Sequence, residues 1–277
     1  MPYPSGTGTD IIEKMFACPI CHADMTVSDD GRVLHCLGAR KHCWDISSSG
    51  YVNFVGSGGG DSKEAVVARK RFLSLGHYKP AAELVLELIS KYAPTGTVVD
   101  AGCGEGFYGK TVTEGGRALV GFDLSRPAVE AASKLRLKNA FFSVAGINQM
   151  PIKDNCAAVL TNIFAPCFES EFARVLKPEG VLIIVGAGSE HLAELKAALY
   201  ESVTENTRRA DLPTNMKLVE TRRLTYDFTL DNAEQICDLF AMTPYYYRTS
   251  KESASRLTEL EGLTVKADFD FFVYMKK

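Results

Sequence analysis

Apolar and polar positions follow the period of a strand or of a helix over most of the chain. Five short apolar runs have the length of buried strands and lie at 97–100, 118–123, 141–144, 157–163 and 181–185. Amphipathic stretches at 109–114 and 127–138 separate the first three runs and predict helices. Strands that alternate with helices predict a doubly wound, mostly parallel α/β sheet.

Further elements flank this core on both sides. Residues 62–90 have helical periodicity with a break at Gly76. Residues 217–229 and 266–275 alternate as strands do, and the stretch 231–241 between them predicts a helix. Two long strands that pair with each other give the sheet an antiparallel edge, so the expected sheet has seven strands.

A glycine-rich loop follows the first apolar run and opens the first helix. It comprises Asp100, Gly102, Gly104 and Gly106, and Asp123 ends the second run twenty-one residues after Gly102. Glycines let the backbone approach a ligand closely, and the amides at a helix start are free to donate. An acid at the end of the second strand is placed to accept the ribose hydroxyls of an adenosine.

The order of residues in the loop discriminates between two cofactors. A dinucleotide site has the form G-x-G-x-x-G, with its amides on a pyrophosphate. The form here, D-x-G-x-G-x-G, suits S-adenosylmethionine, which has no phosphate and whose ammonium group an acid before the first glycine helps to hold. We therefore expect a Rossmann-like, class I S-adenosylmethionine-dependent methyltransferase fold, with the cofactor at Asp100, Gly102, Gly104, Gly106 and Asp123.

The eight cysteines are distributed unevenly. Four of them, Cys18, Cys21, Cys36 and Cys43, lie within twenty-six residues, and His42 stands among them. A C-x-x-C turn followed by a hairpin is the layout of a zinc ribbon, and the first three thiolates need one more ligand, His42 or Cys43. A redox-active C-x-x-C is the competing interpretation, but that motif belongs at a strand-to-helix junction.

The glycine-rich stretch 56–60 predicts a flexible break between two domains. We expect a zinc-binding module at 1–56 and a methyltransferase domain at 57–277. Hydrophobic residues make up 46% and charged residues 23% of the 277, as in soluble globular proteins. No run approaches eighteen apolar residues and no leader opens the chain, so we expect a cytoplasmic protein with no membrane partner.

The formal net charge of −3 argues against a nucleic-acid partner when it is taken for the whole chain. Residues 62–80, however, contain five basic residues and one acidic residue, a net charge of +4. Arg69, Lys70 and Arg71 are therefore candidates to guide RNA phosphates, although a run of charges is more often a solvated helix face. The aromatic cluster 245–248 is a candidate for stacking on a base, with core packing as the alternative.

Nine stretches spread over nearly the whole chain carry a resemblance to a known family: 18–21 with Cys36 and His42, 50–54, 68–73, 76–78, 100–108, 164–167, 171–178, 191–196 and 242–244. In these stretches the chain resembles the zinc-containing 23S ribosomal RNA (guanine-N1)-methyltransferases. The resemblance implies S-adenosylmethionine-dependent methylation of N1 of a guanine in a hairpin of 23S ribosomal RNA. It also implies that four residues line the donor site: Tyr78, Gly104, Glu105 and His191. For His191 the alternative is a surface residue that caps the next helix.

The resemblance implies a ligand set of three cysteines and one histidine, with the histidine before an aromatic-Asp pair. The sequence 42–45, His-Cys-Trp-Asp, fits this pattern and favours His42. His42 follows Cys36 by six positions, a longer spacing than is usual in the family, so Cys43 remains an alternative ligand. Homodimerisation is compatible with the resemblance, but no motif supports it.

Methyl transfer to guanine N1 requires an aligned acceptor and loss of the N1 proton. Acceptor-side candidates follow the fourth apolar run, where such a sheet opens beside its cofactor: Asn162, Phe164 and Pro166. Pro166-Cys167 also resembles the Pro-Cys of cytosine-C5 methyltransferases, whose other motifs are not evident here. The alternative functions are a small-molecule or other RNA-base methyltransferase of the same fold, and a non-catalytic zinc-ribbon RNA-binding protein.

Overall fold

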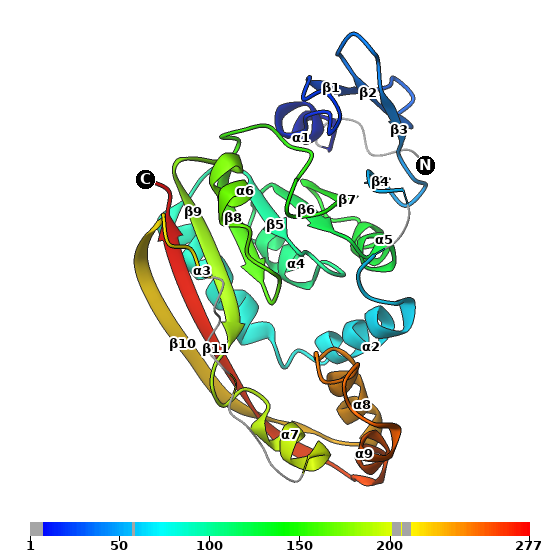
Figure 1. The fold of residues 1–277 in the computed structure, drawn as a ribbon, viewed down its shortest axis with the longest axis vertical. Helices are drawn as coiled ribbons and strands as arrows, with labels where there is room; N and C mark the ends of the chain where they lie inside the picture. The colour runs from blue at the N-terminus through cyan, green and yellow to red at the C-terminus, as the bar shows by residue number, and fades with distance from the viewer. Residues whose placement is uncertain (1–7, 57–58, 201–205, 207–211) are drawn as a thin grey trace.

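The computed structural model describes residues 8–56, 59–200, 206 and 212–277. In this part of the chain the named strands form two sheets, an antiparallel sheet of three strands and a mixed sheet of eight. The small sheet lies with helix α1 (Gly8–Met15) at one end of the molecule, at the top of Figure 1. Two long strands of the large sheet extend toward the opposite end (Figure 1).

The small sheet is the hairpin expected from the sequence, with one strand added. Its strands are β1 (Met25–Val27), β2 (Val33–Cys36) and β3 (Cys43–Asp45), and β2 pairs antiparallel with both neighbours. In the turn before β2, Gly31 has a φ of +70°, which glycine adopts without strain.

The large sheet has the strand order β10-β11-β9-β8-β5-β6-β7-β4. The six strands from β9 to β4 run parallel, and β11 and β10 add the antiparallel edge that the alternating C-terminal pattern predicts. The strands are β4 (Tyr51–Asn53), β5 (Val98–Ala101), β6 (Leu119–Asp123), β7 (Ala140–Val144), β8 (Ala157–Ile163), β9 (Leu176–Ala187), β10 (Lys217–Leu230) and β11 (Leu263–Met275). The fold class is confirmed, but the described sheet has eight strands instead of seven because the buried Tyr51 and Val52 bring β4 alongside β7.

Alternate residues of the parallel strands enter two apolar cores, one on each face of the sheet. Val98 and Phe142 belong to the first core, whereas Val99 and Phe141 belong to the second. The first core includes residues of α2 (Lys63–Ser74), α3 (Lys79–Tyr92), α4 (Phe107–Glu114) and α5 (Arg126–Lys134). The second includes residues of α6 (Glu169–Val175) and α1. Helices on both faces are what a doubly wound sheet requires.

The N-terminal segment shares this second core. Phe16, which follows α1, packs against Phe122 and Phe141 of the large sheet with ring centroids 5.8 and 5.4 Å apart. Strand β4 also lies before the predicted domain boundary at residue 56, although it pairs with β7. The division into 1–56 and 57–277 therefore stays a prediction, and Ser57 and Gly58 of the expected linker lie outside the described residues.

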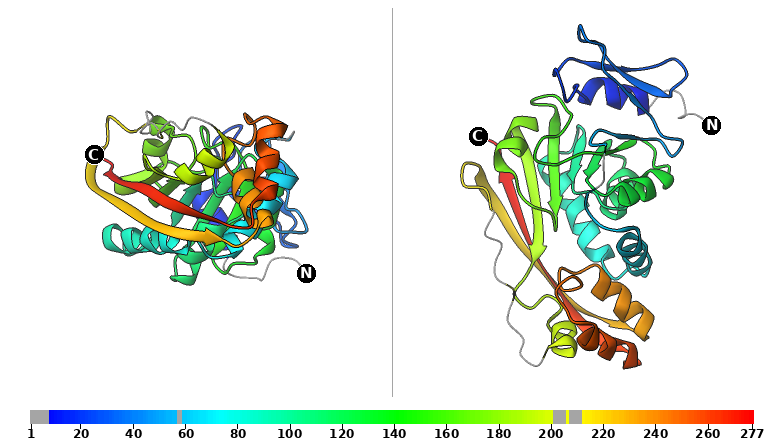
Figure 2. Two further views of the ribbon diagram at one scale, coloured as in Figure 1. Left: turned by 90° about the horizontal axis from the view of Figure 1, so that it is seen from below. Right: turned by 45° about the vertical axis from the view of Figure 1, so that its right-hand side comes forward.

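The C-terminal hairpin carries helices away from the centre of the sheet. Strands β10 and β11 pair over their whole length, and α8 (Ala233–Ala241) follows β10 and packs against α2 (Figure 2). The shorter α7 (Ala193–Leu199) and α9 (Lys251–Ser255) lie at the same end. Among the helices described, none has the length and apolar character needed to cross a membrane.

Candidate functional site

The glycine loop joins β5 to α4 at the carboxyl end of β5. Gly102, Gly104 and Gly106 have φ angles of +91°, +53° and +85°, which glycine adopts at little cost. A Cβ at Gly102 would lie 2.6 Å from the Cβ of Ala165, in the segment after β8. The loop therefore touches the segment that carries the acceptor-side candidates, and a side chain at Gly102 would prevent that contact.

Three carboxylates surround this loop. Asp100 is buried at the end of β5 and accepts a hydrogen bond of 2.8 Å from the hydroxyl of Thr161. Burial raises the pKa of Asp100 to about 7, and the charges of Asp123 and Glu105 act in the same direction. Burial also raises the pKa of Glu105, although Arg69 opposes this shift. A site that concentrates acidic groups in this way favours a cationic ligand over an anionic one.

Asp123 stands at the end of β6, where the sequence predicts the ribose-binding acid. Its Oδ2 accepts a 3.0 Å hydrogen bond from the N–H of Gly104, and its Oδ1 accepts one of 2.8 Å from the N–H of Ser125. The hydroxyl of Ser125 in turn donates to the carbonyl oxygen of Asp61 at 2.8 Å. Asp123 thus fixes the glycine loop against β6 and keeps an acidic group at the position expected for adenosine.

Ion pairs within the protein engage two of the three basic residues that were expected to guide RNA. Arg69 pairs with Asp61, and its Nε lies 3.7 Å from Oε2 of Glu105. Arg71 donates through Nε, at 2.8 Å, to the nearly buried carboxylate of Asp238 in α8. Acids of the chain therefore pair with Arg69 and Arg71, and a role of this segment in guiding RNA phosphates stays a prediction.

Tyr78 and His191 form one buried pair. Nδ1 of His191 accepts a hydrogen bond of 3.1 Å from the N–H of Asp268, and Nε2 lies 3.2 Å from the hydroxyl of Tyr78. Burial lowers the pKa of His191 to about 4, so the ring is neutral at pH 7. Its proton is then on Nε2, which donates to Tyr78. A surface role for His191 as a helix cap is wrong, since only 6% of the residue is exposed.

The acceptor-side candidates divide into one supporting residue and two accessible ones. Asn162 is buried, and its Nδ2 donates to the carbonyl oxygens of Ala101 and Pro166 at 3.3 and 3.0 Å. Phe164 is 47% exposed and has a φ of +52°, a strained conformation for an aromatic residue, and Pro166 is also exposed. Cys167 is half-buried and packs against the second core.

Phe164 is linked to the Tyr78–His191 pair through aromatic contacts. Its ring centroid lies 5.8 Å from that of His191 and 5.9 Å from that of Phe269. Strained residues persist where the surrounding structure holds them, and they concentrate at functional sites. The structure therefore brings Phe164 and Pro166 together with the donor-side residues, whereas Asn162 holds the segment in place.

The cysteine cluster contains four side chains, and His42 is one of them. The ligand atoms of Cys18, Cys21, Cys36 and His42 all lie within 4.8 Å of one another. Their close separations, 3.3 Å for Cys21 Sγ to Cys36 Sγ and 3.4 Å for Cys18 Sγ to His42 Nδ1, approach the roughly 3.5–3.8 Å of ligands on tetrahedral zinc. Cys43 is exposed in β3 and is not a member of this group.

The aromatic cluster at 245–247 combines the two roles considered for it. Tyr245 is half-buried and donates to Oδ1 of Asn206 at 3.1 Å. Tyr246 and Tyr247 are 45% and 65% exposed and meet edge to face with centroids 5.3 Å apart. Core packing thus explains Tyr245, and the other two rings are open to solvent.

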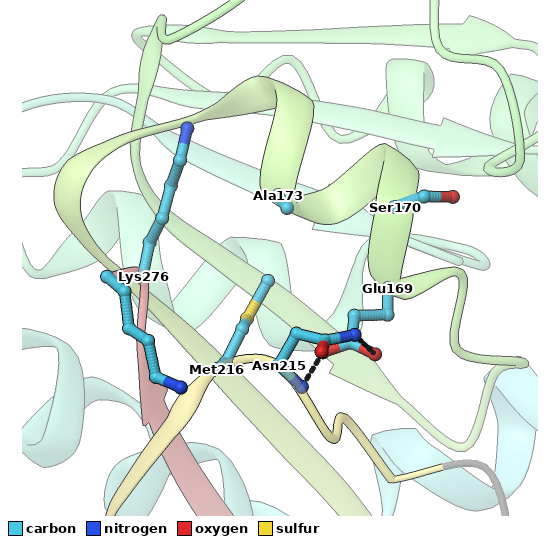
Figure 3. A pocket seen from close by; sticks show the side chains of 7 residues that line it. Glu169, Ser170, Ala173, Asn215, Met216 and Lys276 are labelled. Carbon is cyan, nitrogen blue, oxygen red and sulfur yellow. Dashed lines mark hydrogen bonds between the residues drawn. The ribbon is translucent and has the colours of Figure 1, made fainter.

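A surface hollow of about 520 Å³ lies apart from these residues (Figure 3). It lies between α6 and the ends of the long hairpin, where the carboxylate of Glu169 accepts a 2.6 Å hydrogen bond from the N–H of Asn215. None of its lining residues is a donor-side or acceptor-side candidate.

Comparisons with known proteins show which family this chain belongs to. The profile of a methyltransferase domain matches residues 93–244, more than half of the chain. The 23S rRNA (guanine(748)-N(1))-methyltransferase of Streptomyces fradiae is 31% identical over 91% of this chain and 93% of its own length. YxjB of Bacillus subtilis (strain 168), classed with the 23S rRNA (guanine-N(1)-)-methyltransferases, is 33% identical over 95% of this chain and 98% of its own length. The chain belongs to this family of methyltransferases. Among solved structures, the YcgJ protein of Bacillus subtilis superposes with a TM-score of 0.47 at 16% identity, over 69% of this chain and 97% of that one.

The methyltransferase also contains an arrangement that its sequence did not reveal. Arg69 stands between Asp61 and Glu105, which links the start of α2 to the glycine loop. Arg69 is thirty-six residues from Glu105, and a basic run gives no indication of which acids its members will meet. The contact forms in the folded protein, where Ser125 after β6 holds the segment that precedes α2.

Proposed function

We propose that the protein transfers the methyl group of S-adenosylmethionine to N1 of a guanine in a hairpin of 23S ribosomal RNA. The observation that supports this most directly is the acidic glycine loop, in a chain that aligns with guanine-N1 methyltransferases over more than nine-tenths of its length. The fold and the family relationship support the reaction class, and the exposed Phe164 beside the loop supports a planar acceptor.

The residues present fit S-adenosylmethionine better than a dinucleotide. Oε2 of Glu105 is buried and makes no hydrogen bond in the described residues, and Nε of Arg69 lies 3.7 Å from it, beyond hydrogen-bond distance. This oxygen can therefore accept a hydrogen bond from a donor group such as an ammonium. The acidic groups of Asp100 and Asp123 lie around the same loop, and a pyrophosphate would be repelled there. In this proposal the carboxylates of Asp100 and Glu105 attract the ammonium group, and Asp123 accepts the ribose hydroxyls.

The protein's main task in the reaction is alignment. When bound, S-adenosylmethionine supplies an electrophilic methyl group beside a positively charged sulfur. Phe164 and Pro166 contact the guanine and set its plane, and Asn162 holds the carbonyl of Pro166 in position. The neutral His191 fixes the hydroxyl of Tyr78 beside this surface. The N1 proton of guanine must leave during the reaction.

A structural zinc ion completes the proposal. Cys18, Cys21, Cys36 and His42 would hold it, because their ligand atoms already converge and none of the four positions remains for a substrate. Gly38 supports this assignment, since a Cβ there would lie 2.9 Å from Sγ of Cys21 and 3.2 Å from Sγ of Cys36. We propose that the module at 1–56 docks RNA for the methyltransferase domain at 57–277.

The decisive experiment uses the full-length protein and unmodified 23S ribosomal RNA. Incubation with S-adenosylmethionine carrying a tritiated methyl group should label this RNA but not 16S ribosomal RNA. Reverse transcription should stop beside the modified guanine, because N1 methylation disrupts base pairing. Asp123→Ala should abolish both signals through loss of donor binding. Label transfer to small molecules without any to RNA would favour the small-molecule alternative, and RNA binding without donor binding would favour a non-catalytic protein.

A further inference from the structure

Tyr108 has a buried hydroxyl that makes no hydrogen bond within the described residues. The residue is the second of α4, directly after the glycine loop, and its ring meets that of Phe107 edge to face at 5.1 Å. A buried hydroxyl without a hydrogen bond destabilises the folded protein, so its retention calls for an explanation.

The surroundings of this hydroxyl place it at the donor site. Burial raises the pKa of Tyr108, and three neighbours act in the same direction: Tyr226, Glu105 and Asp100. The phenol therefore keeps its proton and acts as a hydrogen-bond donor. Tyr108 also lies close enough to Tyr78 to raise the pKa of Tyr78, after the larger effect of burial. The hydroxyl of Tyr226 is already engaged, because it donates to the carbonyl oxygen of His77 at 2.6 Å.

Two buried polar atoms at the same loop therefore make no hydrogen bond, although Oε2 of Glu105 has an ion-pair contact with Nε of Arg69 at 3.7 Å. Their hydrogen-bonding requirements are opposite. Oε2 of Glu105 can accept hydrogen bonds, and the hydroxyl of Tyr108 can donate one, yet the two do not bond to each other. A ligand that satisfies both must carry a donor and an acceptor close together. The amino-acid end of S-adenosylmethionine carries both, as an ammonium and a carboxylate on one carbon atom.

We propose that the hydroxyl of Tyr108 donates a hydrogen bond to the carboxylate of the donor's amino-acid end, while Glu105 accepts one from the ammonium group beside it. This inference rests on the proposed function, and it assigns the binding of the donor's carboxylate to a residue outside the glycines. Tyr108 is in this sense a binding residue for the cofactor and for its product, S-adenosylhomocysteine.

The test compares Tyr108→Phe with wild type by calorimetric titration of the full chain. A hydrogen bond to a charged group is worth about 1.5–3 kcal/mol, so S-adenosylhomocysteine should bind the variant about tenfold to a hundredfold more weakly. 5′-Methylthioadenosine, which has the adenosine but no amino-acid end, should bind both proteins equally. Without ligand, the variant should be at least as stable to urea as wild type, because it loses only an unpaired hydroxyl.

Ser133→Ala is the matched control, because Ser133 in α5 also has a buried hydroxyl without a partner. This variant should bind both ligands as wild type does. Equal affinity of wild type and Tyr108→Phe for S-adenosylhomocysteine would overturn the inference and leave the proposed function intact. An equal loss for both ligands would also overturn it, since the effect would then not involve the amino-acid end. Failure of wild type to bind S-adenosylhomocysteine would overturn the proposed function as well.

Discussion

Replacing Asp100 by Asn should stabilise the donor-free protein at high pH while weakening donor binding. Burial raises the pKa of Asp100 from 3.8 to about 7, so ionising it in the folded protein costs energy. Each pKa unit corresponds to about 1.4 kcal/mol, and the shift of about three units therefore costs about 4 kcal/mol once the group is fully ionised. The asparagine keeps an oxygen that can accept the hydrogen bond from the hydroxyl of Thr161, so the main change is loss of the charge.

The sign of the pH dependence follows from the raised pKa. Between pH 4 and pH 7 the unfolded chain has released the Asp100 proton, whereas the folded protein still holds it. The wild-type protein therefore loses stability through this group as the pH rises toward 7, and Asp100→Asn does not. The free energy of unfolding of the variant minus that of wild type should therefore increase by about 2–3 kcal/mol between pH 5 and pH 8.

Urea unfolding of both proteins from pH 5 to pH 8, without donor and at constant zinc, measures this difference. Asp231→Asn, which changes an exposed acid, is the control and should show no such change with pH. Calorimetry should show that S-adenosylmethionine binds Asp100→Asn more weakly than wild type, because its ammonium loses one carboxylate. A stability difference that stays constant from pH 5 to pH 8 would refute the assignment of a raised pKa to Asp100.

Three further predictions test the acceptor surface, the cysteines and the metal. Phe164→Ala should slow methyl transfer to RNA about tenfold to a hundredfold, which corresponds to the loss of one base–aromatic stack. The affinity for S-adenosylhomocysteine, measured by calorimetry, should not change. A normal rate of methyl transfer would exclude stacking of the base on Phe164. Cys167→Ser should retain methyl transfer in the tritium assay, and complete loss would instead indicate a covalent thiolate mechanism. Chelation should release one zinc ion per chain by mass spectrometry and change the fluorescence of Trp44, the single tryptophan, whose ring lies 6.3 Å from His42. Cys43→Ser should keep the zinc and Cys36→Ser should lose it, and the reverse result would reassign the ligands.

The architecture of the central sheet could be predicted because its signals are local. Apolar runs of strand length with amphipathic stretches between them determine which residues can be buried on both faces, and Val98 and Val99 do enter opposite cores. The loop from Asp100 to Gly106 was recognisable for the same reason, since its glycines are required by backbone conformations within the loop itself. The three-residue strand β4 was not predicted as part of the sheet, because its pairing with β7 joins residues about ninety positions apart.

The charges show the opposite case, in which the sequence alone did not reveal the partners of charged residues. Arg69 and Arg71 belong to a segment of net charge +4, which suggested a surface for RNA. Asp61 lies only eight positions before Arg69, whereas Glu105 and Asp238 are distant in the sequence, and the packing of α2 against α8 brings Asp238 to Arg71. A local count of charges carries no information on such partners, because electrostatic pairing depends on distance in space and not along the chain.

The sequence by itself determined the class of fold, the glycine loop with its acids, and the group of cysteines. Each of these depends on the spacing of neighbouring residues and on backbone conformations that few residue types adopt. The tertiary structure decided that His42 joins the cysteine cluster while Cys43 does not, and that His191 is buried against Tyr78. It also left the hydroxyl of Tyr108 and one oxygen of Glu105 without a hydrogen bond at a single loop. Burial and the direction of a side chain arise only when distant elements pack together.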